Sequence, residues 1–202
     1  LEEDGDLDFP ARSVLMKTFI MDGKRVETRL LMRHADGAWA GYSYEWLDDQ
    51  SDAVLLPSSK KKRVGTQDWH FPSRSECMRC HTEAAGYSLG LELGQLERDF
   101  TYPSTNLRAN QLKTLAHIEL FESDLASSSF EAYPEPFGAA PLEQRARAYL
   151  HANCAHCHRE NGAGRGALDL LFSTELAEAA LCNREPEASD LGVQNARLLA
   201  PG

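Results

Sequence analysis

Two copies of one five-residue pattern constrain this chain more than any other feature of its sequence. Each copy has two cysteines separated by two residues and followed directly by histidine: Cys77-Met78-Arg79-Cys80-His81 and Cys154-Ala155-His156-Cys157-His158. On a helical turn, thiols at positions i and i+3 share one face. Two such thiols can form thioether bonds to the vinyl groups of a haem, and the adjacent imidazole can bind its iron. The pattern therefore predicts two covalently bound haem c groups, attached through Cys77, Cys80, Cys154 and Cys157, with His81 and His158 as the proximal iron ligands.

The residues before each motif favour a helix. Ser73, followed three residues later by Glu76, fits the capping box that marks a helix start, and Pro72 precedes it. Before the second motif, residues at helical spacing form one stripe that leads into Cys154: Leu142, Ala146, Tyr149, Leu150 and Asn153. His151 lies on the opposite side of this helix, so we expect it at the protein surface.

Zinc is the main alternative to haem, because two Cys-x-x-Cys pairs can supply four thiolates. Zinc-binding pairs are usually about 15 to 20 residues apart. Cys80 and Cys154 are 74 residues apart, and zinc gives no reason for a histidine after each pair. A thioredoxin-like redox pair would need a βαβ pattern, and two disulfides would need haem-free protein. Cys182 has no partner left, so we expect a buried free thiol there, with an intermolecular disulfide as the alternative.

Composition narrows the class of protein further. The 202 residues suffice for one ordinary domain or two small ones, and no apolar run approaches the roughly 20 residues that span a bilayer. Asp and Glu number 31 against 21 Lys and Arg, and the resulting net charge of −10 would repel phosphate backbones. We therefore expect no nucleic-acid partner and no membrane span. The first residues have neither the basic nor the apolar region of a signal peptide, so any such segment is expected to be missing from this sequence.

Several stretches of the chain resemble a known family, the periplasmic bacterial dihaem c-type cytochromes found beside, or fused to, PQQ-dependent sugar dehydrogenases. These stretches are residues 27–31, 39–46, 71–77, 110–112 and 147–150, the last of which runs into Cys154. The second half also resembles a class I cytochrome c domain. That likeness rests on Tyr149 before the motif, and on Gly162, Gly164, Gly166 and Leu168-Asp169-Leu170 after it.

These patterns predict an α+β fold, with a small antiparallel β-rich N-terminal region followed by two mainly helical cytochrome c-like haem units. The expected domains are residues 1–70, 71–135 and 136–202. From Ser13 to about Phe71 the apolar period is two, and Asp22-Gly23 and Asp36-Gly37 are hairpin turn signals. In residues 39–46 the aromatic side chains share one face, which we expect to form the core of the sheet rather than to contact the first haem. The basic run at 60–63 is expected to be a solvated turn, and residues 122–141, rich in Ser and Pro, a linker.

A transfer haem commonly has a second axial ligand, Met or His, on its distal side. All four methionines precede Cys80, so none follows the second motif. His117 and His70 are the distal candidates for the first haem. The resemblance implies that relatives continue past residue 202 with a Met-bearing loop and a last helix. Either this chain is truncated at its C-terminus, or the second haem is five-coordinate, water-bound or ligated from elsewhere.

The sequence thus predicts an electron carrier rather than an enzyme, in which two haems relay single electrons between a periplasmic dehydrogenase and a downstream acceptor. A redox protein is the expected partner, and the resemblance points to a PQQ-dependent dehydrogenase. Thioether attachment requires reduced thiols and export machinery, so we expect the periplasm or the outer side of a bacterial membrane. The alternative hypothesis is a dihaem peroxidase-like enzyme that uses an open haem coordination position.

Overall fold

The computed structural model describes residues 5–122, 125 and 130–200, and the chain packs into two compact units. The N-terminal unit is Asp8–Glu83, and the C-terminal unit is Ala84–Gly202 together with Leu1–Leu7. The first motif therefore belongs to the N-terminal unit and the second motif to the C-terminal unit. The three domains expected from the sequence stay a prediction.

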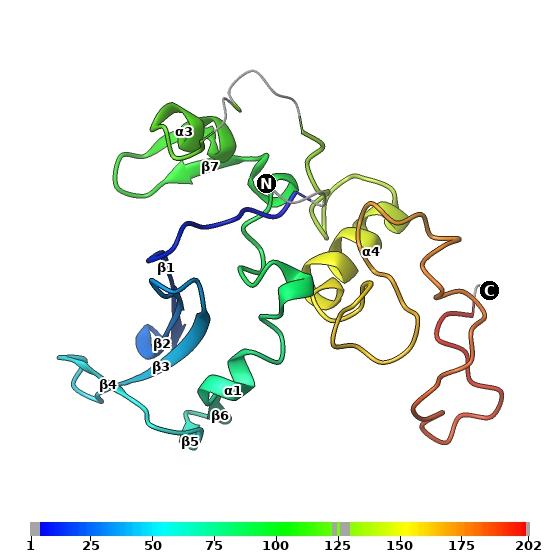
Figure 1. The fold of residues 1–202 in the computed structure, drawn as a ribbon, viewed down its shortest axis with the longest axis horizontal. Coiled ribbons are helices and arrows are strands. Elements are labelled where there is room, and N and C mark those ends of the chain that lie inside the picture. The colour runs from blue at the N-terminus through cyan, green and yellow to red at the C-terminus, as the bar shows by residue number, and fades with distance from the viewer. Residues whose placement is uncertain (1–4, 123–124, 126–129, 201–202) are drawn as a thin grey trace. The chain divides into compact units, whose positions relative to one another are not determined.

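A four-stranded antiparallel sheet forms most of the N-terminal unit (Figure 1). Its strands are β1 (Val14–Met21), β2 (Lys24–Arg33), β3 (Trp39–Trp46) and β4 (Ala53–Leu55), in that order. Asp22 and Gly23 join β1 to β2 with φ of 50° and 75°, which is the left-handed conformation that tight hairpins require. Both hairpins predicted from the Asp-Gly pairs are confirmed.

The buried face of this sheet is the opposite of the one expected. Gly41 and Ser43 of β3 are buried, whereas Tyr42 and Tyr44 are only half-buried. Met16, which lies in register with Leu30 on the aromatic face, is 72% exposed. The prediction that the aromatic side chains form the core of the sheet is therefore wrong. Small residues on the other face allow the rest of the unit to approach the backbone closely.

A second hairpin in the N-terminal unit holds the basic run. Strands β5 (Lys60–Val64) and β6 (Gln67–Phe71) pair antiparallel, so the run lies on a strand rather than in the turn that we expected. Lys60, Lys61 and Arg63 are exposed, so the expected solvation of the run is confirmed. Lys60 and Lys62 both bind the Glu45 carboxylate, at 2.5 and 3.1 Å. These ion pairs connect β5 to β3. Lys60 and Lys62 are two positions apart on β5, so both side chains lie on the same face and can reach Glu45.

The C-terminal unit has short elements separated by loops. They are η1 (Glu83–Ala85, at the boundary), α2 (Leu93–Leu96), β7 (Asp99–Tyr102), β8 (Leu107–Asn110), α3 (Gln111–His117), α4 (Leu142–Leu150) and the π-helical turn η2 (His151–Ala155). Buried leucines of α2 and α3 form its main apolar cluster, with Leu125. Part of the expected linker at 122–141 lies outside the described residues. Where it is described, it contains no helix or strand.

The predicted fold class is wrong. Strands hold 27% and helices 17% of the described residues, so the chain does not contain two mainly helical cytochrome c-like units. Residues 99–110 form the hairpin β7–β8, and the described chain after η2 has loops and one bridge, between Cys182 and Leu199 (orange to red in Figure 1). Three glycines at 162, 164 and 166, followed later by prolines, disfavour a helix there.

Helix α4 is present as expected, but a different face of it is buried. Leu142 and Tyr149 of the predicted stripe are 72% and 55% exposed. The buried positions are instead Ala148, His151 and Ala155, which recur at helical spacing across α4 and η2. The expectation that His151 lies at the surface is therefore wrong. Two alanines let neighbouring backbone approach this side, and His151 is accommodated there by hydrogen bonds described below.

Candidate haem-attachment turns

The first motif begins in α1 (Arg74–Cys77), whose start is fixed by the predicted capping box. The Ser73 hydroxyl accepts a hydrogen bond from the Glu76 N–H at 3.3 Å, and the Glu76 carboxylate accepts one from the Ser73 N–H at 2.8 Å. After α1 the chain turns, and the N–H groups of Cys80 and His81 both donate to the Cys77 carbonyl, at 3.3 and 3.1 Å. The turn thus gathers the two thiols and the imidazole of the motif within one helical turn.

Cys77 packs directly against β3 at Gly41. A Cβ atom at Gly41 would lie 2.5 Å from the Cys77 Cβ and 2.6 Å from its Sγ, closer than carbon and sulfur atoms can approach. Burial is the largest influence on the Cys77 thiol and raises its pKa; nearby Arg29 lowers it, and Glu27 raises it. The thiol is therefore held in its neutral form at neutral pH.

The sequence reasoning missed a fully buried carboxylate, that of Glu27, on this face of the sheet. It accepts two hydrogen bonds from the Arg29 guanidinium at 2.8 and 2.9 Å. It also accepts bonds from the Ser43 hydroxyl at 2.6 Å and the Trp69 indole N–H at 3.0 Å. A buried charge needs this many donors. The available signal was the position of Glu27 and Arg29 two residues apart in a strand, which places both on one face.

The second motif follows α4 through η2. The N–H groups of Cys157 and His158 both donate to the Cys154 carbonyl, at 3.0 and 2.9 Å. These are the same two hydrogen bonds, between the same motif positions, as at the first motif. The two Cys-x-x-Cys-His segments therefore adopt one kind of turn, although the surrounding elements differ completely.

A glycine-rich loop closes over the second turn. The Gly164 N–H donates to the Cys157 carbonyl at 2.7 Å, and the Leu170 N–H donates to the His158 carbonyl at 2.9 Å. A Cβ at Gly164 would lie 2.6 Å from the Cys157 carbonyl oxygen and 2.7 Å from the His158 Nδ1. At Gly162 it would overlap the same oxygen. Both positions therefore require glycine, because the loop passes directly over the motif backbone.

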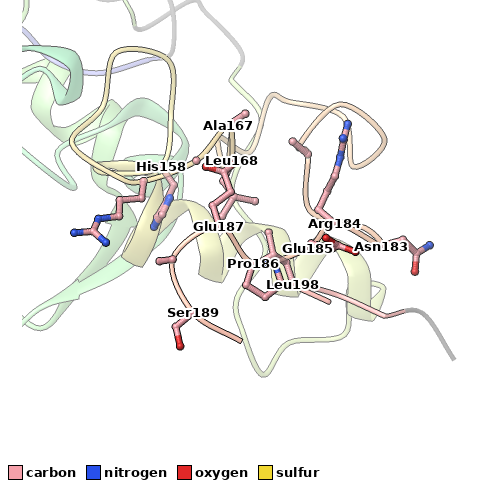
Figure 2. A pocket seen from close by; sticks show the side chains of 14 residues that line it. His158, Ala167, Leu168, Asn183, Arg184, Glu185, Pro186, Glu187, Ser189 and Leu198 are labelled. Atoms are coloured by element: carbon pink, nitrogen blue, oxygen red, sulfur yellow. The ribbon is translucent and has the colours of Figure 1, made fainter. Parts of the chain in front are cut away.

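His158 lies on the wall of a cavity of about 750 Å³ in the C-terminal unit. Figure 2 shows this cavity, whose other walls include Leu168, Arg184, Glu187 and Leu198. Its volume is in the range of small-molecule and cofactor sites. The Nδ1 atom of His158 is buried and has no hydrogen-bond partner among the described residues. Leaving a buried polar atom unpaired costs about 1–3 kcal/mol.

Between the thiols of the second motif, His156 is half-buried. Burial lowers its pKa, and the adjacent His158 lowers it further. His156 is therefore neutral at neutral pH.

The distal candidates are both exposed. His117 ends α3 in the C-terminal unit, whereas the first motif belongs to the N-terminal unit. His70 lies on β6, and its Nε2 is 3.2 Å from the Glu76 carboxylate, which also caps α1. This contact occupies His70 at the start of the motif helix. Both assignments as distal ligands stay predictions.

None of the five cysteines is joined in a disulfide within the described part of the chain, and Cys182 is half-buried rather than buried as we expected. Among the described residues no helix combines the length and the apolar character that crossing a bilayer demands. Comparisons of this chain with protein-family models, curated proteins and solved structures found no match.

Proposed function

We propose that this protein is a dihaem c-type cytochrome that relays single electrons between a periplasmic dehydrogenase and a downstream acceptor. The observation that carries the proposal is the turn shared by the two motifs. In each, the N–H groups of the second cysteine and the histidine bond to the carbonyl of the first cysteine. Zinc coordination or a redox disulfide would account for a Cys-x-x-Cys turn but gives no reason for a histidine at its end in both units.

The residues of the second motif fit a haem group. Cys154 and Cys157 are not joined in a disulfide and lie three positions apart on a helical turn, so both can bond to one porphyrin edge. His158 lines a cavity large enough for a cofactor. Bound haem would supply reversible one-electron chemistry at its iron.

The residues of the first motif offer the same donor set on a different support. Cys77 and Cys80 are free thiols, and His81 follows them in the turn. Here the motif packs against the sheet rather than against a glycine-rich loop. Gly41 has no side chain that would clash with Cys77, and Glu27 holds Arg29 and Ser43 by hydrogen bonds. The protein would thus hold each haem by sulfur and imidazole while different elements set its surroundings and its potential.

The charge of the chain bears on its partner. A net charge of −10 before any haem propionate is counted favours docking to a basic patch on a redox partner, with association that weakens as salt is added. A PQQ-dependent dehydrogenase as donor, and the periplasm or outer membrane side as the compartment, belong to the same proposal.

Spectroscopy of the matured protein tests the relay. We expect a reduced-minus-oxidised spectrum of c-type haem, electron paramagnetic resonance signals from two haems, and rapid oxidation of the reduced protein by a one-electron acceptor. Hydrogen peroxide should not be turned over. A high-spin haem with sustained peroxide turnover would replace the relay by the peroxidase-like enzyme, and colourless matured protein would overturn both.

A further inference from the structure

The segment 169–174 follows the glycine-rich loop of the second motif. These residues, all of which the structure describes, contain no helix or strand. Leu170 is 8% exposed, and its N–H donates to the His158 carbonyl at 2.9 Å. Backbone polar groups in such a segment need partners outside a regular ladder. Side chains from α4 and η2 supply several of them.

Side chains of α4 and η2 bind both backbone polar groups of Phe172. One guanidinium nitrogen of Arg147 donates to the carbonyls of Phe172 and Thr174, each at 2.5 Å. The Nδ1 atom of His151 accepts the Phe172 N–H at 3.0 Å, and the Nε2 atom of the same ring lies 2.7 Å from the Glu92 carboxylate. Arg147 and His151 are four positions apart, so one face of the helix that leads into the motif holds the segment.

The Phe172 ring strengthens this attachment. The Arg147 guanidinium lies 5.3 Å from the centre of that ring, within the range of a cation–π contact. The Tyr133 ring also packs against it, at 4.8 Å between centroids. Arg147 thus contacts both the backbone and the side chain of Phe172. Because hydrogen bonds from a charged donor are about twice as strong as neutral ones, we expect Arg147 to be the main attachment of the segment to α4.

Through residues 170–172 the contacts of Arg147 extend to the histidine of the second motif. The His158 carbonyl accepts the Leu170 N–H, and the His158 N–H donates to the Cys154 carbonyl, each at 2.9 Å. The peptide groups on both sides of the His158 Cα are therefore held. Because a residue has only two soft backbone torsions, the direction of the His158 Cα–Cβ bond is held as well. A shift of residues 170–172 would rotate the imidazole away from this direction.

We propose that Arg147 is a positioning residue for the His158 imidazole: by holding residues 170–174 against α4, it sets the orientation in which the ring is offered to the iron of the second haem. This inference rests on the proposed function. Groups beyond the direct ligands orient those ligands and tune the metal that they bind. Helix α4 therefore leads into the thiols of the motif and also orients its imidazole.

The test compares variants of the matured protein, with the second haem isolated by Cys77→Ser/Cys80→Ser. Arg147→Met keeps most of the length of the side chain and removes its donors. The electron paramagnetic resonance g values of a ferric haem depend on the orientation of the axial imidazole, so we expect them to shift and broaden in Arg147→Met. Amide exchange at Leu170 should become about tenfold faster or more, because hydrogen bonds that hold its segment are lost. Arg147→Lys keeps a charged donor and should return both readouts toward the unmodified values.

Arg145→Met is the matched control. Arg145 lies on the same helix and also donates to backbone carbonyls, those of Ala140 and Pro136, at 3.0 and 2.8 Å. These partners precede α4 and are not part of the segment that reaches His158. We expect Arg145→Met to lower the melting temperature as Arg147→Met does, but to leave the g values and the Leu170 exchange rate unchanged. A merely structural role for Arg147 would give the two variants the same result.

Unchanged g values in Arg147→Met, or the same changes in Arg145→Met, overturn the inference. Rapid Leu170 exchange in the unmodified protein overturns it too, and this measurement needs no variant to fold. Intact mass, measured first on the same samples, separates the inference from the proposed function. Haem on the second motif with no effect of Arg147→Met refutes the inference alone, whereas protein without haem at Cys154 and Cys157 refutes both.

Discussion

Replacing Gly41 by alanine tests how the sheet supports the first motif. The new Cβ would lie 2.5 Å from the Cys77 Cβ and 2.6 Å from its Sγ. Non-bonded carbon atoms are most stable at about 3.5–4.0 Å, so α1 must move away from β3 by roughly 1 Å. Overpacking of this kind costs about 1–3 kcal/mol. For a chain of this size, about 2 kcal/mol corresponds to a fall in melting temperature of about 4–8 °C.

The displacement also moves the thiol. We expect Gly41→Ala to reduce haem attachment at Cys77 and Cys80 severalfold and to leave the second motif fully loaded. Gly164→Ala should do the reverse, because its Cβ would lie 2.6 Å from the Cys157 carbonyl oxygen and 2.7 Å from the His158 Nδ1. Peptide mapping by mass spectrometry after periplasmic maturation measures the haem on each motif separately.

The two variants control for each other, since each adds one methyl group beside a different motif. Loss of haem from both motifs in both variants would indicate general misfolding. If Gly41→Ala carried a full complement of haem at both motifs and kept its melting temperature, the close packing of Cys77 on β3 would be wrong.

Two further variants test contacts within the N-terminal unit, which carries the first motif. Ser73→Ala removes the cap that accepts the Glu76 N–H, so thermal unfolding should show a loss of about 1 kcal/mol; an unchanged melting temperature would contradict the capping box. Glu45→Gln removes the carboxylate shared by Lys60 and Lys62. Burial raises the pKa of Glu45, but the hydrogen bonds and charges of the two lysines outweigh it and hold that pKa below its ordinary value of 4.5. A lowered pKa stabilises the fold above pH 4.5, and this contribution disappears as the pH falls through the lowered value. Unfolding by urea should therefore show Glu45→Gln about 1 kcal/mol less stable at neutral pH and equal to the unmodified protein in strong acid; a difference independent of pH would refute the ion pairs.

Features set by neighbouring residues were predictable from the sequence. The capping box at Ser73 depends on Glu76 three residues later, and the first hairpin depends on an Asp22-Gly23 pair that adopts positive φ. Such patterns act within one turn of the chain, where the sequence specifies the geometry almost completely.

Features set by distant partners were not predictable in the same way. The residues around Tyr149 do form a helix, as their spacing predicted. Which face of that helix is buried, however, depends on the residues that pack against it. His151 is buried because Glu92 and the Phe172 N–H, far away in the sequence, satisfy both of its ring nitrogens. No local pattern indicates that a histidine will meet such partners, and the same holds for Glu27 and its indole donor Trp69.

The predicted helical haem units failed for a related reason. The likeness after His158 rested on glycines, and the structure uses two of them, Gly162 and Gly164, to pass a loop over the motif backbone. Glycine spacing thus indicated the close approach of loop and motif. It carried no information about helices further along the chain, where propensity favours loops.

The most direct test of the central claim is the intact mass and pyridine haemochrome content of protein matured in a bacterial periplasm. We predict two haems for each chain, adding about 1.2 kDa to the 22.5 kDa polypeptide, and one haem after Cys154→Ser/Cys157→Ser. A polypeptide of unmodified mass with five titratable thiols, or with bound zinc in place of haem, would contradict it.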